Sequence, residues 1–396
     1  MKHATPKTST VEKIRSVIDS NRAPDLLKEL LAQADVIIGG DRPWDIQMHD
    51  DRTYARVLRE GSLGLGESYM DGWWDSPQLD ECLSKILRAR LDREVSKNWV
   101  VLAHAVRARL FNPQATRPFE IADKHYDIGN DLYERMLDPR MIYSCAYWRD
   151  AEILDDAQER KLDLVCRKLG LRAGMRVLDI GCGWGEGLKF AAERYGVRGT
   201  GVTVSREQAE YAQTLCTGLP IDIRLQDYRE LDGSDGGFDR IFSLGMFEHV
   251  GVRNYAEYLD VARRCIAPDA PDGGLFLLHT IGGSTSVDHT DPWIARYIFP
   301  NSMLPSAKQI AAAAEGRFVI EDWHNFGADY DRTLQAWRAN VEAAWERLPS
   351  HYDERFRRMW RFYLAGSMAS FRSRHIHLWQ VVLSPNGVPG GYVAPR

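Results

Sequence analysis

An acid and an imidazole stand at the ends of two apolar stretches. GMFEHVG (245–251) follows the first stretch and contains Glu248 and His249, and FLLHTIG (276–282) carries His279 at the end of the second. Ionisable groups placed at strand ends in this way can move protons or hold ions. Either could instead be an orienting or ion-pairing group, as a lone histidine usually is. Their joint presence at neighbouring strand ends favours a reaction site.

A glycine-rich loop follows an earlier apolar stretch. In VLDIGCGWG (177–185) the strand reaches Asp179 and passes into Gly181, Cys182 and Gly183, and a helix is expected over 188–194. Glycines let the backbone approach a ligand closely, and cofactors bind in the crevice at such strand ends. The residues LD, which precede GCG with one residue between them, favour the methyltransferase form of this loop over the dinucleotide form. A purely structural glycine turn is the alternative.

The next two strand ends offer groups for the rest of a nucleoside. In GVTVSREQ (201–208), Thr203 and Gln208 are expected near a ribose, and Ser205 is expected to cap a helix in a capping box with Gln208. The alternatives without a ligand are that Ser205 and Gln208 only cap a helix, and that the segment after the following strand is only a polar turn. The residues expected beside an adenine are Gln226, Asp227 and Tyr228.

These residues need a sheet that brings several strand ends to one edge. From residue 158 onward, short apolar stretches alternate with helical ones, which is typical of a doubly wound, mostly parallel sheet. The predicted strands are 176–180, 199–204, 221–226, 238–244, 274–280 and 318–323. Residues 1 to about 90 combine helical patterns with a glycine-rich stretch, GSLGLG (61–66), whose glycines are expected to form turns.

Composition limits the classes of function. The 396 residues carry a net charge of −5, which argues against a dedicated nucleic-acid binder. Six scattered cysteines without metal-ligand spacing predict no metal site and reduced thiols in a cytoplasmic protein. We expect no secretion signal and no membrane-spanning helix, so that a lipid would be met at the bilayer surface.

Two basic segments are candidates for that surface. Residues 86–118 are rich in arginine and partly amphipathic, and their Pro steps predict a linker; they could lie on an anionic membrane or be a core helix with a solvated face. The predicted helix 352–371 could face lipid head groups, although a solvated face is the favoured interpretation. Its arginines are Arg355, Arg357, Arg358, Arg361 and, just beyond it, Arg372.

The chain resembles the cyclopropane-fatty-acyl-phospholipid synthases and is similar to the mycolic acid cyclopropane synthases. The matching stretches include GSLGLGESYMDGWW, HYDIGNDLY, YSCAYW, VLDIGCGWG, GMFEHVG, FLLHTIG and HNFGADY. The resemblance implies an α/β fold: a Rossmann-like class I S-adenosylmethionine-dependent methyltransferase domain with a smaller N-terminal α/β or mostly helical lipid-binding domain. The implied boundaries are 1–105 for the lipid-binding domain, 106–120 for a linker and 121–396 for the catalytic domain.

The resemblance also implies two sets of site residues. Tyr143 and Ser144 should contact the cofactor, together with the glycine loop and the two strand ends described above. A bicarbonate ion should lie beside the reacting carbons. The residues implied around it are Cys145, Glu248, His279, Ile281 through its backbone, and Tyr330.

The implied reaction transfers a methyl group from S-adenosylmethionine to a double bond in a phospholipid acyl chain. The resulting carbocation needs a dry pocket, with Tyr143 and Tyr330 as candidate stabilising rings. Bicarbonate would then take a proton as the ring closes. We further expect a homodimer bound peripherally to the inner face of the membrane. The alternatives are an enzyme of the same site that gives a methyl-branched lipid, and a non-catalytic module that binds the cofactor or lipid.

Overall fold

The computed structural model describes residues 23–91, 129–234 and 236–396, which fall into two compact units. We call them the helical unit (Met1–Phe111, Asp291–Ile298 and Pro349–His375) and the sheet unit (Asn112–Thr290, Phe299–Leu348 and Ile376–Arg396). The helical unit thus takes in two late segments that the expected boundaries gave to the catalytic domain. The expected linker and most of the basic stretch 86–118 lie outside the described residues.

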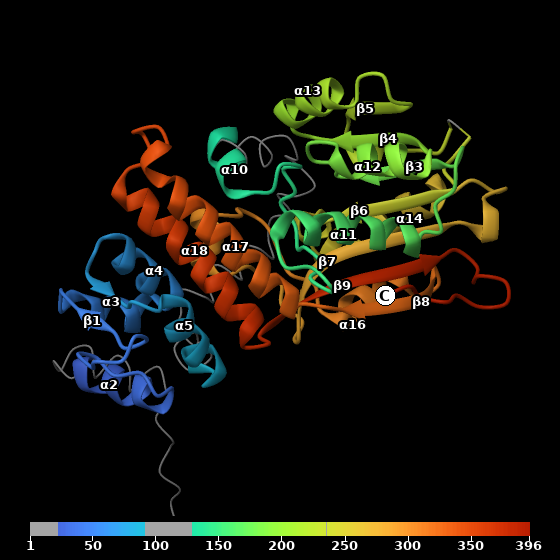
Figure 1. Cartoon of the computed structure of the whole chain (residues 1–396). Coiled ribbons are helices and arrows are strands. Elements are labelled where there is room, and N and C mark those ends of the chain that lie inside the picture. Colours follow the sequence, from blue (N-terminus) through green and yellow to red (C-terminus); the bar gives the residue numbers. More distant parts are fainter. Residues whose placement is uncertain (1–22, 92–128, 235) are drawn as a thin grey trace, which may run out of the picture. The chain divides into compact units, whose positions relative to one another are not determined.

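The sheet unit is built on a seven-stranded sheet (Figure 1). Its order is β5-β4-β3-β6-β7-β9-β8, with the first five strands parallel and β9 antiparallel to both of its neighbours. The chain runs outward from β3 in one direction and then in the other, so β3 and β6 flank the point where ligands bind in such sheets. The strands are β3 (Arg176–Ile180), β4 (Arg198–Thr203), β5 (Ile221–Leu225), β6 (Arg240–Leu244), β7 (Leu275–Gly283), β8 (Val319–Asn325) and β9 (Ile376–Ser384).

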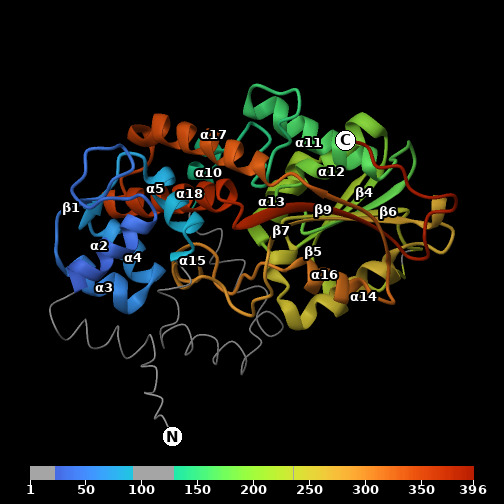
Figure 2. The ribbon, with the colours of Figure 1, turned by 90° about the horizontal axis from the view of Figure 1, so that it is seen from below.

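Helices cover both faces of this sheet, with α14 and α16 on one side and α11 and α12 on the other (Figure 2). Alternate strand residues enter two separate cores: Ile241 packs toward α14, and Phe242 packs toward α11 and α12. The helices are α10 (Asn130–Met136), α11 (Leu154–Lys168), α12 (Glu186–Tyr195), α13 (Arg206–Leu215), α14 (Tyr255–Cys265), α16 (Ala307–Ala314) and α17 (Ala328–Ala344). Short 3-10 turns are η1 (Tyr228–Glu230), η2 (Phe247–His249), η3 (Val252–Asn254), η4 (Pro271–Gly273) and η5 (Trp345–Arg347).

The predicted doubly wound sheet is present, and a strand lies within or across each of the six predicted ranges. The ends differ by a few residues, as is usual for strand limits. The seventh strand, β9, was not predicted. It pairs with β7 along nearly its whole length and separates β7 from β8, so these two strands are consecutive in the sequence but are not neighbours in the sheet.

The described part of the helical unit is mostly helical, in agreement with one of the two predicted forms. Its elements are α2 (Ala23–Gln33), α3 (Arg52–Glu60), α4 (Ser62–Met70), α5 (Leu79–Arg88), α15 (Pro292–Tyr297), α18 (Glu354–Arg372), and a two-stranded ribbon of β1 (Gln47–Met48) and β2 (Trp74–Asp75). No helix in the described ranges is long and apolar enough to cross a membrane.

The interpretation of GSLGLG as turn-forming glycines was wrong beyond Gly61. Gly61 has a positive φ and joins α3 to α4, whereas Gly64 and Gly66 lie inside α4. A Cβ on Gly64 would lie 2.5 Å from the backbone oxygen of Arg56, and one on Gly66 would lie 2.4 Å from the ring of Trp293. These two glycines therefore allow α4 to pack closely against its neighbours.

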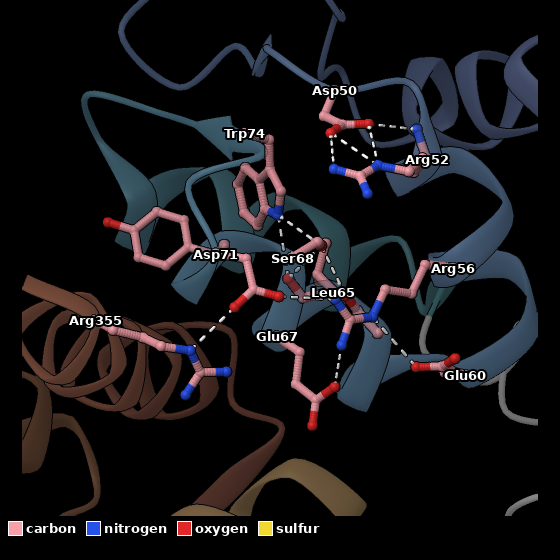
Figure 3. A network of polar contacts seen from close by, with 12 residues as sticks. Asp50, Arg52, Arg56, Glu60, Leu65, Glu67, Ser68, Asp71, Trp74 and Arg355 are labelled. Atoms are coloured by element: carbon pink, nitrogen blue, oxygen red, sulfur yellow. Dashed lines mark hydrogen bonds and ion pairs between the residues drawn. The ribbon is translucent and has the colours of Figure 1, made fainter.

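A solvated face was the favoured interpretation for the arginines of α18, with lipid head groups as the alternative. Arg355 is exposed as expected, whereas Arg358 and Arg372 are mostly covered, and all three pair with acids. Arg355 pairs with Asp71 at 3.0 Å, and Arg358 pairs with Asp75 at 2.7 Å. Figure 3 shows Asp71 between Arg355 and Arg56. The third, Arg372, reaches Asp80 at 2.8 Å and Glu81 at 3.2 Å. These cations join α18 to acids of its own unit.

Candidate active site

The glycine loop lies directly after β3 and takes a conformation that few other residues allow. Gly181, Gly183 and Gly185 all have positive φ, at 85°, 53° and 89°. A Cβ on Gly181 would lie 2.6 Å from the side chain of Met246, which belongs to the loop after β6. The absence of a side chain at Gly181 thus lets the predicted cofactor loop approach the loop that carries Glu248.

Asp179 is the penultimate residue of β3 and is only 3% exposed. Its Oδ1 atom is buried and has no hydrogen-bond partner among the described residues. Burial raises the pKa of this carboxyl well above its ordinary value, against the attraction of Lys161. Such an atom needs a polar partner, and a bound ligand is one source.

The second strand end brings Thr203 and Gln208 together. The Thr203 hydroxyl donates to Oε1 of Gln208 at 3.0 Å, and the Ser205 hydroxyl accepts from the Gln208 backbone N–H at 3.3 Å. Ser205 is therefore the predicted N-cap. The predicted capping box is wrong in its second half, because the Gln208 side chain turns to Thr203 instead of to the Ser205 backbone.

The third strand end is partly occupied by its own contacts. Asp227 accepts the backbone N–H of Arg229 at 2.9 Å and forms an ion pair with its guanidinium at 2.5 Å. Gln226 donates its backbone N–H to Thr203, and Tyr228 packs edge-on against Tyr258. Asp227 thus takes part in a polar turn. An adenine contact of this segment stays a prediction.

A buried lysine supports the Tyr143–Ser144 segment, and sequence analysis did not single it out. Lys161 of α11 donates to the Ser144 hydroxyl at 3.0 Å, and Gln158 donates to the Ser144 carbonyl at 2.9 Å. Lys161 is fully buried, and this burial lowers its pKa to about 8. The signal was available, because Gln158, Lys161 and Lys168 fall on the apolar stripe of the helix at helical spacing.

Cys145 is positioned by the start of α17, which carries Tyr330. The backbone N–H of Ala146 donates to the Thr333 hydroxyl at 3.1 Å, and that of Trp148 donates to Asp329 at 2.8 Å. Cys145 is completely buried, which raises the pKa of its thiol well above the ordinary value. It therefore stays a thiol and can serve as a weak hydrogen-bond donor, not as a thiolate.

Glu248 lies just beyond the end of β6 and contacts β7. Its Oε1 accepts the Ile281 backbone N–H at 2.7 Å. His279 lies two residues before Ile281 on β7 and is the register partner of Leu244, the last residue of β6. Oε2 of Glu248 and Nε2 of His279 are both buried and lack a hydrogen-bond partner within the described ranges. Each unpaired buried atom is costly, and a ligand that pairs with it would remove that cost.

The charge states at this site follow from burial. Loss of water raises the pKa of Glu248 to about 7, although the Ile281 N–H favours the charged form. Burial lowers the pKa of His279 well below its ordinary value, and the charges of Lys161 and Lys168 lower it further. Near neutral pH, His279 is therefore uncharged and Glu248 can hold or release a proton.

Aromatic rings pack beside the predicted site residues in two groups. Phe326 meets the ring of His279 at 6.0 Å and that of Tyr147 at 5.4 Å, both edge-on. Trp337 contacts the rings of Tyr143 and Tyr330, at 5.2 and 5.9 Å. His279, Tyr143 and Tyr330 thus each have an aromatic neighbour. His249, by contrast, faces Phe299.

A family model described as mycolic acid cyclopropane synthetase matches residues 113–381. The chain belongs to this family. It is 50% identical over 387 residues to the cyclopropane-fatty-acyl-phospholipid synthase of Escherichia coli (strain K12), covering 96% of this chain and 99% of the relative. It is 33% identical over 365 residues to tuberculostearic acid methyltransferase UfaA1 of Mycobacterium tuberculosis (strain ATCC 25618 / H37Rv), covering 86% and 82%.

A solved structure supports the same assignment. The crystal structure of mycolic acid cyclopropane synthase CmaA1 complexed with SAH and CTAB is 31% identical, with a TM-score of 0.59, over 67% of this chain and 98% of that one. These comparisons confirm the predicted family and the class I methyltransferase fold. They also confirm that the chain is an enzyme of the S-adenosylmethionine-dependent class.

Proposed function

We propose that this enzyme transfers the methyl group of S-adenosylmethionine to the cis double bond of a phospholipid acyl chain and closes a cyclopropane ring, with bicarbonate as the base. The single observation that carries the site assignment is that two buried atoms, Glu248 Oε2 and His279 Nε2, have no hydrogen-bond partner in the part of the chain that the structure describes. The identity of 50% with a cyclopropane-fatty-acyl-phospholipid synthase over nearly the whole chain supports the substrate class.

The residues after β3, β4 and β5 fit the proposed methyl donor. The positive-φ glycines leave room for a ligand at the backbone, and Oδ1 of Asp179 is a buried acceptor in need of a partner. S-adenosylmethionine supplies an electrophilic methyl group when it is bound. The chain's task is to hold it in line with the double bond, since an isolated alkene is a weak nucleophile and alignment can lower the barrier by several kcal/mol.

The residues at the β6–β7 ends fit a small oxyanion that still carries a proton. A neutral His279 can donate from Nε2, and Glu248 Oε2 can accept; the buried thiol of Cys145 and the hydroxyl of Tyr330 would complete the set. Bicarbonate has both kinds of group and supplies a base that cannot form a stable ester with a carbocation. A neutral histidine donor opposite a carboxylate acceptor suits such an ion.

The chain's other contribution is to keep water away from the cation formed on the acyl chain. Methyl transfer leaves a positive charge on the adjacent carbon, and loss of a proton from the added methyl lets the new C–C bond close the ring. Water would quench the cation before this happened. Aromatic rings near the proposed site would exclude water and stabilise the cation with their faces. These rings belong to Tyr143, Tyr330, Trp337 and Phe326.

Lipid analysis tests this proposal. The purified chain is incubated with vesicles of an unsaturated phospholipid and S-adenosylmethionine labelled in its methyl group. We expect one labelled CH₂ per reacted double bond, and cyclopropane protons in the NMR spectrum of the lipid. Glu248→Ala, checked for an unchanged thermal transition, should abolish the ring signal. Full ring formation in that variant would contradict the assigned base site.

A methyl-branched product is the second candidate, because UfaA1 is named a tuberculostearic acid methyltransferase and shares the fold over most of its length. The same lipid sample separates the two: a branched chain carries the labelled carbon without cyclopropane protons. A non-catalytic module would leave the lipid unlabelled.

The place of action is part of the same proposal. The acyl substrate lies in a bilayer, so the enzyme would bind peripherally to the inner surface of the membrane and act there as a homodimer. Co-sedimentation with vesicles of anionic and neutral lipid tests the first point, and light scattering tests the second. Absence of sedimentation with both lipids would reject peripheral binding.

A further inference from the structure

The C-terminal strand places a buried amide beside the reaction-site histidine. Gln380 of β9 is the register partner of His279 on β7 and of His324 on β8. Directly opposed residues on neighbouring strands project to the same face of a sheet. His279, Gln380 and His324 therefore form a row across three adjacent strands, and Gln380 in the middle is fully buried.

We propose that Gln380 is a positioning residue that holds His279 in the tautomer with its proton on Nε2, so that His279 presents a hydrogen-bond donor to the anion. This inference rests on the proposed function, in which an anion lies between His279 and Glu248. Gln380 is not one of the predicted site residues, yet under this proposal it determines which anions the site can bind.

In this structure the nitrogen of the Gln380 amide faces His279, and with that orientation the contact sets the tautomer. Nε2 of Gln380 lies 3.3 Å from Nδ1 of His279. An amide nitrogen can only donate, so Nδ1 must offer its lone pair, and the single proton of a neutral imidazole then resides on Nε2. Nε2 is the atom that is buried and without a partner among the described residues. Its proton is consequently available to a ligand.

The other histidine of the row is already engaged. Nδ1 of His324 lies 3.2 Å from the ammonium group of Lys168, which also pairs with Asp322 at 3.2 Å. His324 is thus satisfied from the side of α11 and does not need the Gln380 amide. This arrangement leaves the amide to His279.

Strand β7, which carries His279, also positions Glu248, the acceptor of the proposed anion site. Ile281 lies two residues after His279 on β7 and donates its backbone N–H to Oε1 of Glu248. With Oε1 held there, Oε2 is the free acceptor. One donor at His279 and one acceptor at Glu248 select an oxyanion that carries a proton, and they discriminate against an anion without one, which cannot donate to Glu248.

A carboxylate in place of the amide would reverse this arrangement. It could only accept, so His279 would place a proton on Nδ1 and would turn its Nε2 lone pair, or a full imidazolium, toward the site. Gln380→Glu changes one atom group at nearly constant volume and is the decisive variant. Gln380→Leu removes the donor without imposing the other tautomer.

The test combines a spectroscopic and a kinetic measurement. Long-range ¹H–¹⁵N spectra of the full chain labelled at histidine report the tautomer, with the His279 signals identified by their loss in His279→Gln. We expect the Nε2–H form in the wild type, a mixture in Gln380→Leu, and Nδ1–H or imidazolium in Gln380→Glu. Activity is measured against added bicarbonate in buffer freed of carbon dioxide. The apparent bicarbonate constant should rise on the order of tenfold in Gln380→Leu and further in Gln380→Glu, while the KM for S-adenosylmethionine is unchanged.

Ser384→Ala is the matched control. Ser384 lies on the same strand, is equally buried, and donates to Glu321 at 2.5 Å, away from the site. Its loss should lower the thermal transition but leave the tautomer and the bicarbonate constant unchanged.

An Nδ1–H tautomer in the wild type would overturn the proposal. So would a uniform fall in activity in the Gln380 variants with unchanged tautomer and bicarbonate dependence, because that result assigns Gln380 to packing alone. If Gln380→Glu does not fold, the wild type and Gln380→Leu decide. Since the spectra need no turnover, they test the Gln380–His279 contact even if the lipid experiment fails.

Discussion

At the scale of single residues, the proposed active site contains groups whose pKa values are shifted by burial. Glu248 has a pKa raised to about 7, and His279 has one lowered well below its ordinary value. Each retains one buried atom without a partner among the described residues. A site prepared in this way is unstable by itself and complete only with a ligand, which is a common property of functional residues.

Glu248→Gln should change how stability depends on pH. Folding raises the pKa of Glu248 from an ordinary 4.5 to about 7, so its contribution to stability is fully present below pH 4.5 and is lost as the pH rises through 7. The variant has no such loss and keeps an acceptor for Ile281. Between pH 5 and 8 its free energy of unfolding, from urea titrations without ligands, should gain on the order of 2–3 kcal/mol relative to the wild type. Glu315→Gln, at an exposed position, controls for loss of a charge. If the difference in free energy of unfolding between Glu248→Gln and the wild type were constant over this range, the raised pKa of Glu248 would be contradicted.

Lys161→Met should impair cofactor binding more than it impairs the fold. It removes the donor that holds the Ser144 hydroxyl, so the KM for S-adenosylmethionine should rise on the order of tenfold, with a smaller change in kcat. Lys168→Met is a matched control, because Lys168 is a second buried lysine on α11 that contacts His324 and Asp322 instead. It should lower stability with little change in that KM. Equal KM values for S-adenosylmethionine in the two variants would contradict a positioning role of Lys161.

At the scale of elements, close packing in the helical unit depends on glycines inside a helix. Gly64 and Gly66 let α4 approach the backbone of α3 and the ring of Trp293. Glycine is a poor helix former, by about 1 kcal/mol relative to alanine, and is retained here where a Cβ has no space. The sequence pattern suggested turns because glycine spacing alone does not distinguish a turn from a crowded helix.

Gly64→Ala should destabilise the chain by about 1–3 kcal/mol or more, since its Cβ would meet a backbone oxygen that cannot move aside. Gly366→Ala on α18 provides the opposite case. The nearest atom to its Cβ is a methyl group of Leu83 at 4.0 Å, so alanine should stabilise the helix by up to about 1 kcal/mol. Thermal unfolding of the two variants measures both effects. A neutral Gly64→Ala would show that α3 and α4 are packed less closely than described.

Sequence patterns gave most of the sheet and the types of the site residues, for identifiable reasons. The central strands β3, β6 and β7 are mostly buried apolar runs, and the VLDIGCGWG loop has a characteristic spacing. The partners of the site residues were harder to predict. Gln380 lies on a strand that follows a long helix, and its contact with His279 depends on β9 entering the sheet between β7 and β8. Lys161 was detectable only as a charged residue on an apolar helix face.

At the scale of the whole molecule, neither unit is a continuous piece of chain. The chain passes between the helical unit and the sheet unit five times, and the last passage delivers β9. β9 fills a position inside the sheet and brings Gln380 to the site, so the C-terminal segment is part of both the fold and the proposed chemistry. The residues beyond it add smaller contacts, such as Arg396 with Asp322 at 2.6 Å.

Two truncations separate these contributions. Ending the chain after His375 removes β9, exposes the edges of β7 and β8, and should give an aggregated or protease-sensitive product. Ending it after Asn386 keeps β9 and removes the contacts of Tyr392 and Arg396, so it should fold with a lowered thermal transition. Limited proteolysis and thermal unfolding are the measurements. A well-folded chain without β9 would contradict its place in the sheet.

The discontinuous helical unit has a consequence for synthesis of the protein. Helix α18 packs against α4 and α5, but about 270 residues separate the end of α5 from the start of α18. At about 5–20 residues per second, the ribosome needs on the order of 15–50 s to produce the missing helix. During that interval the apolar faces of α4 and α5 are uncovered in the nascent chain. Helices α4 and α5 are therefore among the last elements to complete their packing. Chaperone protection of these two helices during translation would matter for the same reason.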